Sequence, residues 1–256
     1  MRRAHWLLSQ IGVDPVKAAR ALWTAPRFVR NWFQFRSQYS GEMRLLPCLH
    51  DWWGEAGEIR HEYFWQDLLV AQRIFHANPR KHVDVGSRID GFVAHVAAFR
   101  EIEVFDIRPL THKIPGVVFR RVDILDLPEA LENYCDSLSS LHALEHVGLG
   151  RYGDPIDAEG TQKAFANLAK MLEDGGLLYL SVPCGRERVE FNAHRIFSLK
   201  TVTRLASGWF LKMVSISVIG REGTIIQVED WEEIVHFLDN SEDYHLLVFV
   251  FRKVSR

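Results

Sequence analysis

From residue 82 onward, short apolar runs alternate with stretches whose apolar residues recur every three or four positions. This alternation is typical of βαβ units and predicts a mostly parallel sheet with helices on both faces. We expect seven strands, at residues 82–85, 101–105, 117–122, 135–139, 176–182, 212–220 and 245–253. We expect the helices of this region at residues 92–99, 160–172, 198–205 and 231–240.

The N-terminal segment has a different pattern. Residues 14–36 predict a helix with a break near Pro26, in which aromatic side chains alternate with arginines. Residues 1–40 carry seven Lys or Arg against Asp14 alone, a charge of +6, which leaves −8 for the remainder of the −2 chain. We therefore expect a basic helical extension over residues 1–40 and a second domain over residues 41–256. The extension could lie on an anionic membrane, dock on a partner, or simply pack against the main domain.

Composition narrows the class of protein further. A chain of 256 residues with 47% hydrophobic residues can bury one large core, and a pI near 6.6 gives no reason to expect nucleic acid as a partner. The three cysteines lack C-x-x-C spacing, which indicates neither a zinc site nor a disulfide framework and favours the cytoplasm. The first residues do not read as a signal peptide, and no apolar run approaches the length of a membrane span.

The stretch HVDVGSRIDGF, residues 82–92, predicts a strand that runs into a glycine and then a helix. Such a junction presents free backbone N–H groups and the positive end of a helix at the carboxyl edge of the strand. Asp84 and Gly86 lie at the strand end, and Gly91 lies where the helix begins. Open α/β sheets bind ligands at this edge, although a glycine here can also serve only as a tight turn.

Two further acids follow strands at informative positions. Asp106 ends the run EIEVFD, twenty residues beyond Gly86, where dinucleotide-binding folds place an acid that accepts hydrogen bonds from ribose hydroxyls. Asp123 follows the next strand and could accept a hydrogen bond from an exocyclic amine of a base. Each acid could instead be a turn former at the end of a loop.

With these motifs, residues 80–253 resemble the class I S-adenosylmethionine-dependent methyltransferases, which have a Rossmann-like fold. The resemblance extends to Leu144-Glu145-His146 after the fourth strand and to the segment MLEDGGLLYLSVP before and along the fifth. It implies S-adenosylmethionine as the cofactor, held by Asp84, Gly86, Ser87, Arg88, Asp106, Ile107, Asp123, Ile124 and Leu141. Arg88 and Asp90 replace the second and third glycines of the family's usual loop, so the backbone should approach a cofactor less closely there.

The motifs DVGSRIDG, LEHVGLGRYGDP and FNAHRIFS together resemble a bacterial-type subfamily that accompanies surface-glycan biosynthesis, and this match extends back to about Tyr39. It implies O-methylation of a sugar or a glycan-linked acceptor. It also implies a cytoplasmic protein, peripheral at the inner face of the membrane, whose residues 1–36 contact the membrane or a glycosyltransferase.

Methyl transfer to a hydroxyl needs positioning and a general base. His146 is our first candidate for the base, with Glu145 as an orienting or substrate-contacting residue and His142 as a second candidate, although a histidine after a strand is often only a packing residue. The acceptor-binding candidates are Arg151, Tyr152, Asn192, His194 and Arg195. Asp154 and Asp157 share one loop but are too few to indicate a metal site.

Two other classes of function stay open. Because Arg88 and Asp90 depart from the glycine pattern, the chain could be a catalytically silent Rossmann-like module that binds a partner or a scaffold. The retained Asp106 and Asp123 argue against this alternative. A nicotinamide-dependent enzyme could use the same sheet, but the Leu-Glu-His segment and the terminal strands fit that function poorly.

Overall fold

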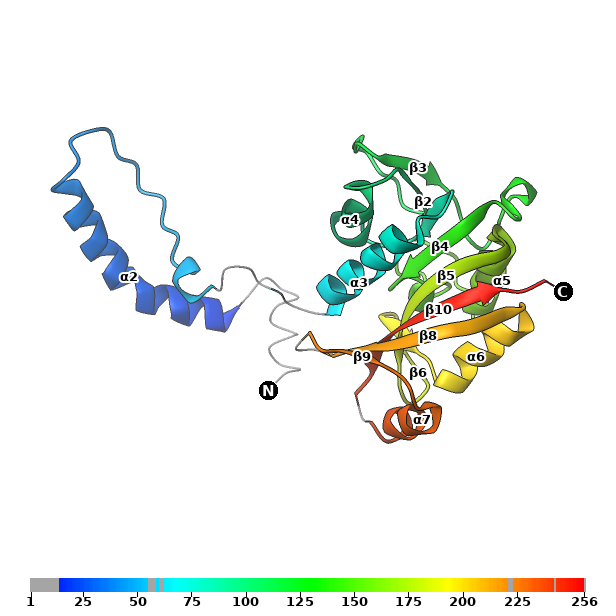
Figure 1. Ribbon diagram of the computed structural model, residues 1–256. Helices are drawn as coiled ribbons and strands as arrows, with labels where there is room; N and C mark the ends of the chain where they lie inside the picture. The colour runs from blue at the N-terminus through cyan, green and yellow to red at the C-terminus, as the bar shows by residue number, and fades with distance from the viewer. Residues whose placement is uncertain (1–13, 55–58, 60–61, 221–222, 242, 256) are drawn as a thin grey trace. The chain divides into compact units, whose positions relative to one another are not determined.

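The computed structural model describes residues 14–54, 59, 62–220, 223–241 and 243–255. The chain divides into two compact units, Met1–Ile59 and Arg60–Arg256, which are drawn in Figure 1. This division differs from the boundary expected at residue 40, because the segment after the first helix packs back onto that helix. Residues 1–13 of the expected extension lie outside the described residues.

The first unit is built on helix α2 (Pro15–Arg36). The carboxylate of Asp14 caps its start by accepting hydrogen bonds from the backbone N–H groups of Val16 and Lys17, both at 3.0 Å. The prediction of a break near Pro26 is wrong, since the helix continues through the proline. The pyrrolidine ring removes one backbone donor, and the remaining helical hydrogen bonds preserve the element. In the described residues, no helix has both the length and the apolar character needed to cross a membrane.

A short 3₁₀ helix, η1 (Asp51–Trp53), lies against α2. The indole N–H of Trp53 donates to the hydroxyl of Thr24 at 3.1 Å, and the ring of Trp53 lies 5.0 Å from that of Trp23. The guanidinium of Arg27 lies 3.2 Å from the ring centre of Trp52. These contacts hold residues 41–54 to α2 and explain why the two segments form one unit.

The second unit contains a mixed eight-stranded sheet in the order β3-β2-β1-β4-β5-β10-β8-β9. Neighbours from β3 to β5 run parallel, and β10, β8 and β9 extend the sheet with antiparallel pairs. The strands are β1 (His82–Val85), β2 (Ile102–Asp106), β3 (Val117–Arg121), β4 (Cys135–Leu141), β5 (Leu172–Cys184), β8 (Leu211–Ile219), β9 (Ile225–Gln227) and β10 (His245–Lys253). The mostly parallel α/β architecture is confirmed, with the short edge strand β9 added to the seven strands expected.

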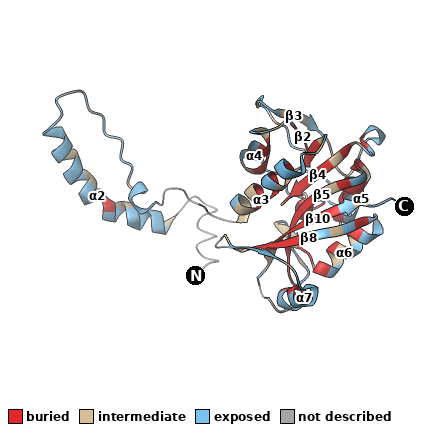
Figure 2. Ribbon diagram, in the orientation of Figure 1, coloured by how far each residue is buried: buried red, intermediate tan, exposed pale blue. Residues whose placement is uncertain are grey.

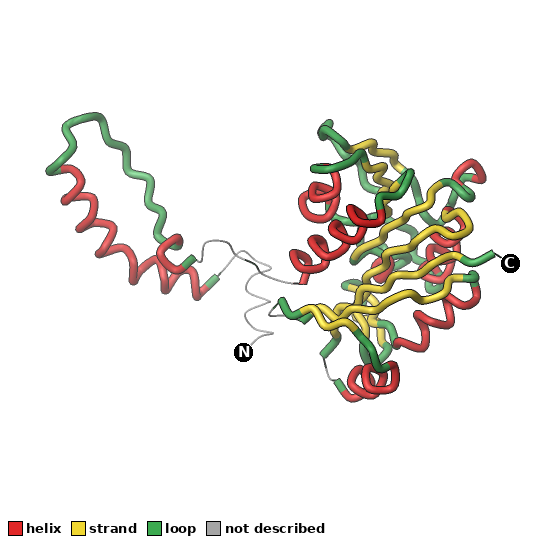
Figure 3. The backbone as a smooth tube through the Cα atoms, viewed as in Figure 1, coloured by secondary structure: helices red, strands yellow, loops and turns green. Residues whose placement is uncertain are grey.

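Helices cover both faces of this sheet, as Figure 3 shows. A separate small hairpin, β6 (Arg188–Glu190) with β7 (His194–Ile196), follows β5. The helical elements are α3 (Glu62–Ala77), η2 (Ile89–Val93), α4 (Ala94–Ala97), η3 (Glu129–Leu131), η4 (Leu144–His146), α5 (Gly160–Met171), α6 (Leu199–Gly208) and α7 (Trp231–Asn240).

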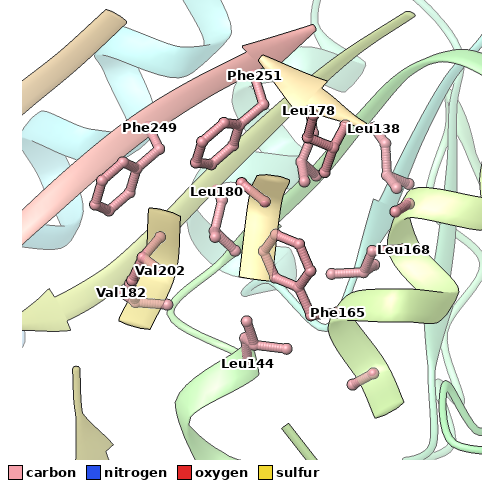
Figure 4. Close-up of a cluster of buried hydrophobic side chains, with 14 of the residues drawn as sticks. Leu138, Leu144, Phe165, Leu168, Leu178, Leu180, Val182, Val202, Phe249 and Phe251 are labelled. Carbon is pink, nitrogen blue, oxygen red and sulfur yellow. The ribbon is translucent and has the colours of Figure 1, made fainter. Parts of the chain in front are cut away.

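Alternate residues of β10 divide the core between the two faces. Leu247, Phe249 and Phe251 belong to the cluster that includes α5, α6 and α7, whereas Leu246 and Val248 belong to the cluster under α3 and α4. Figure 2 shows the buried residues concentrated along the central strands, and Figure 4 shows the first cluster. Each fully buried side chain of this kind stabilises the fold by about 1.5–3 kcal/mol, so the core fixes the strand ends that carry the site.

Candidate functional site

The loop after β1 is shaped by a buried carboxylate. Asp84 is fully buried and accepts hydrogen bonds from the backbone N–H and hydroxyl of Ser87, at 3.0 and 2.5 Å, and from the hydroxyl of Ser139 at 2.6 Å. The backbone N–H of Leu141 donates to the Ser87 hydroxyl at 3.0 Å. Burial raises the pKa of Asp84 to about 7, against the opposing effect of these hydrogen bonds. Asp84, Ser87 and Leu141, which were expected to bind the cofactor, therefore hold the loop after β1 in place through these hydrogen bonds and do not line the cavity at the carboxyl edge of the sheet.

Gly86 turns the chain at the carboxyl end of β1 with φ +78°, and its N–H donates to the carbonyl of Phe105 at 2.9 Å. A Cβ at this position would lie 2.9 Å from the Cβ of Ala143, so the turn requires glycine. Arg88 adopts φ −72° and ψ 129°, which suit any residue, and its guanidinium pairs with the Asp90 carboxylate at 2.6 Å. The two departures from the glycine pattern thus form a surface ion pair without straining the backbone.

At the end of β2, the carboxylate of Asp106 is held by Arg108. The backbone N–H and Nε–H of Arg108 donate to Oδ1 of Asp106 at 2.8 and 2.9 Å, and Nη2 of Arg108 donates to Oδ2 at 2.6 Å. The same guanidinium lies 4.7 Å from the ring centre of Tyr152, which belongs to the loop after η4. Asp106, the residue expected to bind the ribose, therefore lies at the same cavity, but its carboxylate is already hydrogen-bonded to Arg108. Arg108 is in turn stacked on Tyr152 from another loop.

Asp123 follows β3 and accepts a hydrogen bond from the backbone N–H of Leu125 at 2.9 Å. The amide of Asn167, on α5, donates to the carbonyl of Ile124 at 2.7 Å. This contact holds the Asp123–Ile124 turn against α5.

The ends of β1, β2 and β4 and the turn after β3 enclose a cavity of about 380 Å³, which falls in the range of small-molecule sites. Phe105, Leu144 and Leu168 contribute apolar wall. Six of the expected cofactor residues line it: Gly86, Arg88, Asp106, Ile107, Asp123 and Ile124. Residues that follow three different strands in the sequence therefore meet at this cavity, at the carboxyl edge of the sheet.

His142 and His146 line another side of this cavity, and both lie close to the carboxylate of Glu145. His142, at the end of β4, has φ +53°, and its Nδ1 lies 2.7 Å from Oε1 of Glu145. Nε2 of His146 lies 3.7 Å from the same carboxylate oxygen, while its Nδ1 lies 2.7 Å from the carbonyl oxygen of Ala193. Because only a ring N–H can bond to a carbonyl oxygen, His146 carries its proton on Nδ1 when neutral, and its Nε2 is an acceptor.

Burial and the neighbouring charges act in opposite directions on the pKa values of this cluster. It acts to raise the pKa of Glu145, but the neighbouring His142 and His146 outweigh it and leave that pKa below its ordinary value. Burial lowers the pKa of His146, although the charge of Glu145 acts in the opposite sense. Among the described residues, Nε2 of His142 and Oε2 of Glu145 are buried without hydrogen-bond partners. Of the two residues, only His142 lines the cavity.

Helix α3 contributes residues that the sequence analysis missed. The ring of Tyr63 lies 4.5 Å from that of His142, and Tyr63 lines the cavity. Oε1 of Glu62 lies 3.9 Å from Nε2 of His142. Burial raises the pKa of Tyr63, with the charges of Glu145 and Glu62 acting in the same direction, so its hydroxyl stays protonated. The apolar residues that recur over residues 62–77 are the signal from which this helix could have been predicted.

The expected acceptor-binding residues separate into two groups. Arg151 and Tyr152 line the cavity, and the ring of His194 lies 6.5 Å from that of His146. Arg195 instead donates to the carbonyls of Val147 and Asp157, and Asn192 is exposed in the β6–β7 turn. The first group is brought to the site, whereas Arg195 holds the surrounding loops together.

The two acids of the loop after η4 have structural partners. The carboxylate of Asp154 accepts hydrogen bonds from the backbone N–H groups of Gly148, Gly150 and Tyr152. Asp157 pairs with Lys163 at 2.7 Å. In the part of the chain that the structure describes, no three His, Cys, Asp or Glu side chains are grouped as a metal would require.

Comparisons with known proteins show which solved structures share this architecture. A family model described as "Caenorhabditis protein of unknown function, DUF268" matches residues 117–222. No curated protein matches the chain. A solved structure of 1,6-didemethyltoxoflavin-N1-methyltransferase from Burkholderia thailandensis, with bound 1,6-didemethyltoxoflavin and S-adenosylhomocysteine, is 16% identical. The match covers 95% of this chain and 92% of that one, with a TM-score of 0.54.

Two further solved structures share the fold. The [4+2]-cyclase SpnF is 16% identical, with a TM-score of 0.52 over 74% of this chain and 81% of its own. The YcgJ protein from Bacillus subtilis is 14% identical, with a TM-score of 0.52 over 75% of this chain and 99% of its own. At these identities the likeness shows the fold alone, which is the Rossmann-like fold of class I methyltransferases.

Proposed function

We propose that this protein is an S-adenosylmethionine-dependent methyltransferase that O-methylates a sugar or a glycan-linked acceptor. The observation that carries the proposal is the convergence of Gly86, Asp106 and Asp123 on one cavity that is also lined by His142 and His146. The solved methyltransferase with bound S-adenosylhomocysteine has the same fold and supports the choice of cofactor.

The residues at the cavity fit S-adenosylmethionine. The turn at Gly86 leaves no room for a side chain, and Asp123 offers carboxylate oxygens for the adenine amine. Asp106 offers them for ribose hydroxyls once the Arg108 guanidinium moves aside. The bound cofactor would supply an electrophilic methyl group on a sulfonium. The chain's own contribution is then to position the acceptor and to remove a proton from its hydroxyl.

The geometry favours His142 over His146 as the general base. Nδ1 of His142 is held by the Glu145 carboxylate, so the lone pair of its Nε2 faces away from that bond and is free to accept a proton. Nε2 of His146 is also an acceptor, but its Nδ1–H is held by the neutral carbonyl of Ala193, and burial lowers the pKa of His146 and so weakens it as a base. At His142 the Glu145 carboxylate instead stabilises the charge that a protonated ring carries. Glu145 acts in this proposal as a positioning residue that fixes the tautomer of His142.

The acceptor side of the cavity supports a polyhydroxylated substrate. Tyr63 and Tyr152 provide aromatic surface for a sugar ring, and Arg151 provides hydrogen-bond donors. The resemblance to the subfamily that accompanies surface-glycan biosynthesis supports a glycan as the acceptor.

The first test is calorimetric titration of the protein with S-adenosylhomocysteine, with NAD as the control ligand. We expect binding of S-adenosylhomocysteine alone, and roughly tenfold or greater weakening in Asp123→Ala from the lost contact to the base. Asp126→Ala is the matched control, because Asp126 is exposed three residues along the same turn. If S-adenosylhomocysteine does not bind, the proposed cofactor is wrong.

The second test is methyl transfer to a panel of sugars and glycan-linked lipids. His142→Gln should lower the rate roughly a hundredfold at unchanged cofactor affinity, whereas the exposed His76→Gln should not change it. A defect confined to His146→Gln would transfer the base assignment to His146.

One observation favours a catalytically silent binding module instead. Arg108 occupies the Asp106 carboxylate through three hydrogen bonds, as it would in a site that had lost its cofactor. The SpnF cyclase also has this fold, so the fold does not determine the reaction. Failure of S-adenosylhomocysteine to bind to both the native protein and Arg108→Ala would support the silent module.

A further inference from the structure

We propose that helix α2 docks on an anionic lipid surface through an exposed apolar stripe, defined as Leu22, Pro26, Val29 and Phe33. These residues follow the spacing i, i+4, i+7 and i+11, which places them along one side of the helix. The side chains of Leu22, Val29 and Phe33 are 77, 50 and 62% exposed. Large apolar side chains gathered on one helix face mark an interaction surface.

The rest of the first unit covers a different side of α2. Thr24 is buried under Trp53, whose indole donates to its hydroxyl, and Trp32 is half-buried. The guanidinium of Arg27 lies over Trp52. Residues 41–54 are thus already used to cover the Thr24 side of the helix, and the stripe lies outside that contact.

Charge identifies an anionic surface as the occupant. Helix α2 contains five basic residues and no acid: Lys17, Arg20, Arg27, Arg30 and Arg36. Within the described residues, no ion pair joins any of these side chains to a carboxylate. A basic amphipathic helix gains about 1 kcal/mol per Lys or Arg near an anionic leaflet, while its apolar side chains enter the boundary between headgroups and acyl chains.

A lipid surface fits these features better than an acidic protein does. Arg30 lies four residues after Pro26 and three before Phe33, so it flanks the stripe on the helix surface and a planar surface can contact both at once. This inference does not depend on the proposed enzymatic function, because it can be measured without any cofactor or acceptor.

The test is co-sedimentation of the full-length protein with vesicles. One set contains phosphatidylcholine alone, and the other contains phosphatidylcholine with roughly one third phosphatidylglycerol. We expect binding to the second set only, with a progressive loss as salt screens the charges. Equal binding to both sets, or no binding to the anionic set, would overturn the proposal, and the second result would point to an acidic protein partner.

Two variants locate the contact. Leu22→Ser and the double variant Lys17→Glu with Arg30→Glu change exposed side chains and should each weaken vesicle binding roughly tenfold. Val189→Ser and Lys212→Glu are the matched controls, since both lie exposed on strands of the second unit. Circular dichroism checks that helix content is unchanged. If the α2 variants bind as well as these controls, the lipid contact lies elsewhere.

Discussion

Replacing Arg108 with alanine should tighten the binding of S-adenosylhomocysteine if the Asp106 carboxylate is the ribose acceptor. A carboxylate offers about four acceptor positions. The Arg108 side chain uses two of them, at 2.9 and 2.6 Å, and the Arg108 backbone N–H uses a third at 2.8 Å. Two ribose hydroxyls cannot both bond to the remaining position, so the guanidinium must move before the ligand is held.

The size of the effect follows from what the guanidinium loses when it moves. The Arg108 side chain is 43% exposed, and ion pairs at such sites contribute about 0.2–1 kcal/mol. Because about 1.4 kcal/mol corresponds to a tenfold change in affinity, Arg108→Ala should tighten binding by up to about fivefold. Asp106→Ala should weaken it roughly tenfold or more through loss of the ribose contact.

Calorimetric titration of the two single variants and the double variant separates these contributions. Adding Arg108→Ala to Asp106→Ala should change the affinity little, because the competing ion pair is then already gone. Arg186→Ala, on the exposed loop after β5, is the control. Weaker binding by Arg108→Ala alone would refute the reasoning, since it would mean that Arg108 contacts the ligand and does not compete with it.

The remaining predictions concern stability and positioning. A Cβ in Gly91→Ala would overlap Oδ2 of the buried Asp67, so denaturant unfolding should show a loss of about 1–3 kcal/mol, and an unchanged midpoint would contradict the contact. The pKa of Asp84, raised from 3.8 to about 7, adds stability that is present below pH 3.8 and lost as the pH rises towards 7. Asp84→Asn should therefore flatten that slope in urea titrations, and an identical slope would exclude Asp84 as its source. Glu145→Gln should lower kcat at unchanged S-adenosylhomocysteine affinity, and an unaltered pH–rate profile would return Glu145 to a purely structural role.

The elements that the sequence predicted best have a strong local signal. The apolar runs of β1 and β10 and the periodic pattern of α7 match the observed bounds, because burial on a sheet or along one helix face fixes their apolar spacing. Strand β9 and the β6–β7 hairpin have only three residues per strand, too few for a period to emerge. Pro26 was misread because a local rule for proline says nothing of the two turns on either side that keep the helix intact.

The residues of the candidate site likewise differ in whether a local sequence signal could predict them. Gly86, Asp106 and Asp123 were predicted from chain spacing alone, since parallel strands that end at one edge bring their following residues together. The roles of Arg108, Arg195 and Tyr63 depend on contacts between loops and helices far apart in the chain, such as Arg195 with the Val147 carbonyl. Hydrophobic periodicity records which face of an element is buried, but not which polar group that face meets.

The uneven distribution of charge bears on the proposed docking of α2 on anionic lipid. Residues 1–59 carry +3 and residues 60–256 carry −5, so the unit that contains α2 is attracted to an anionic leaflet while the second unit as a whole is repelled. Repulsion of this kind favours contact through α2. High salt should weaken both effects together, so vesicle binding should fall with salt while methyl transfer to a soluble acceptor should not.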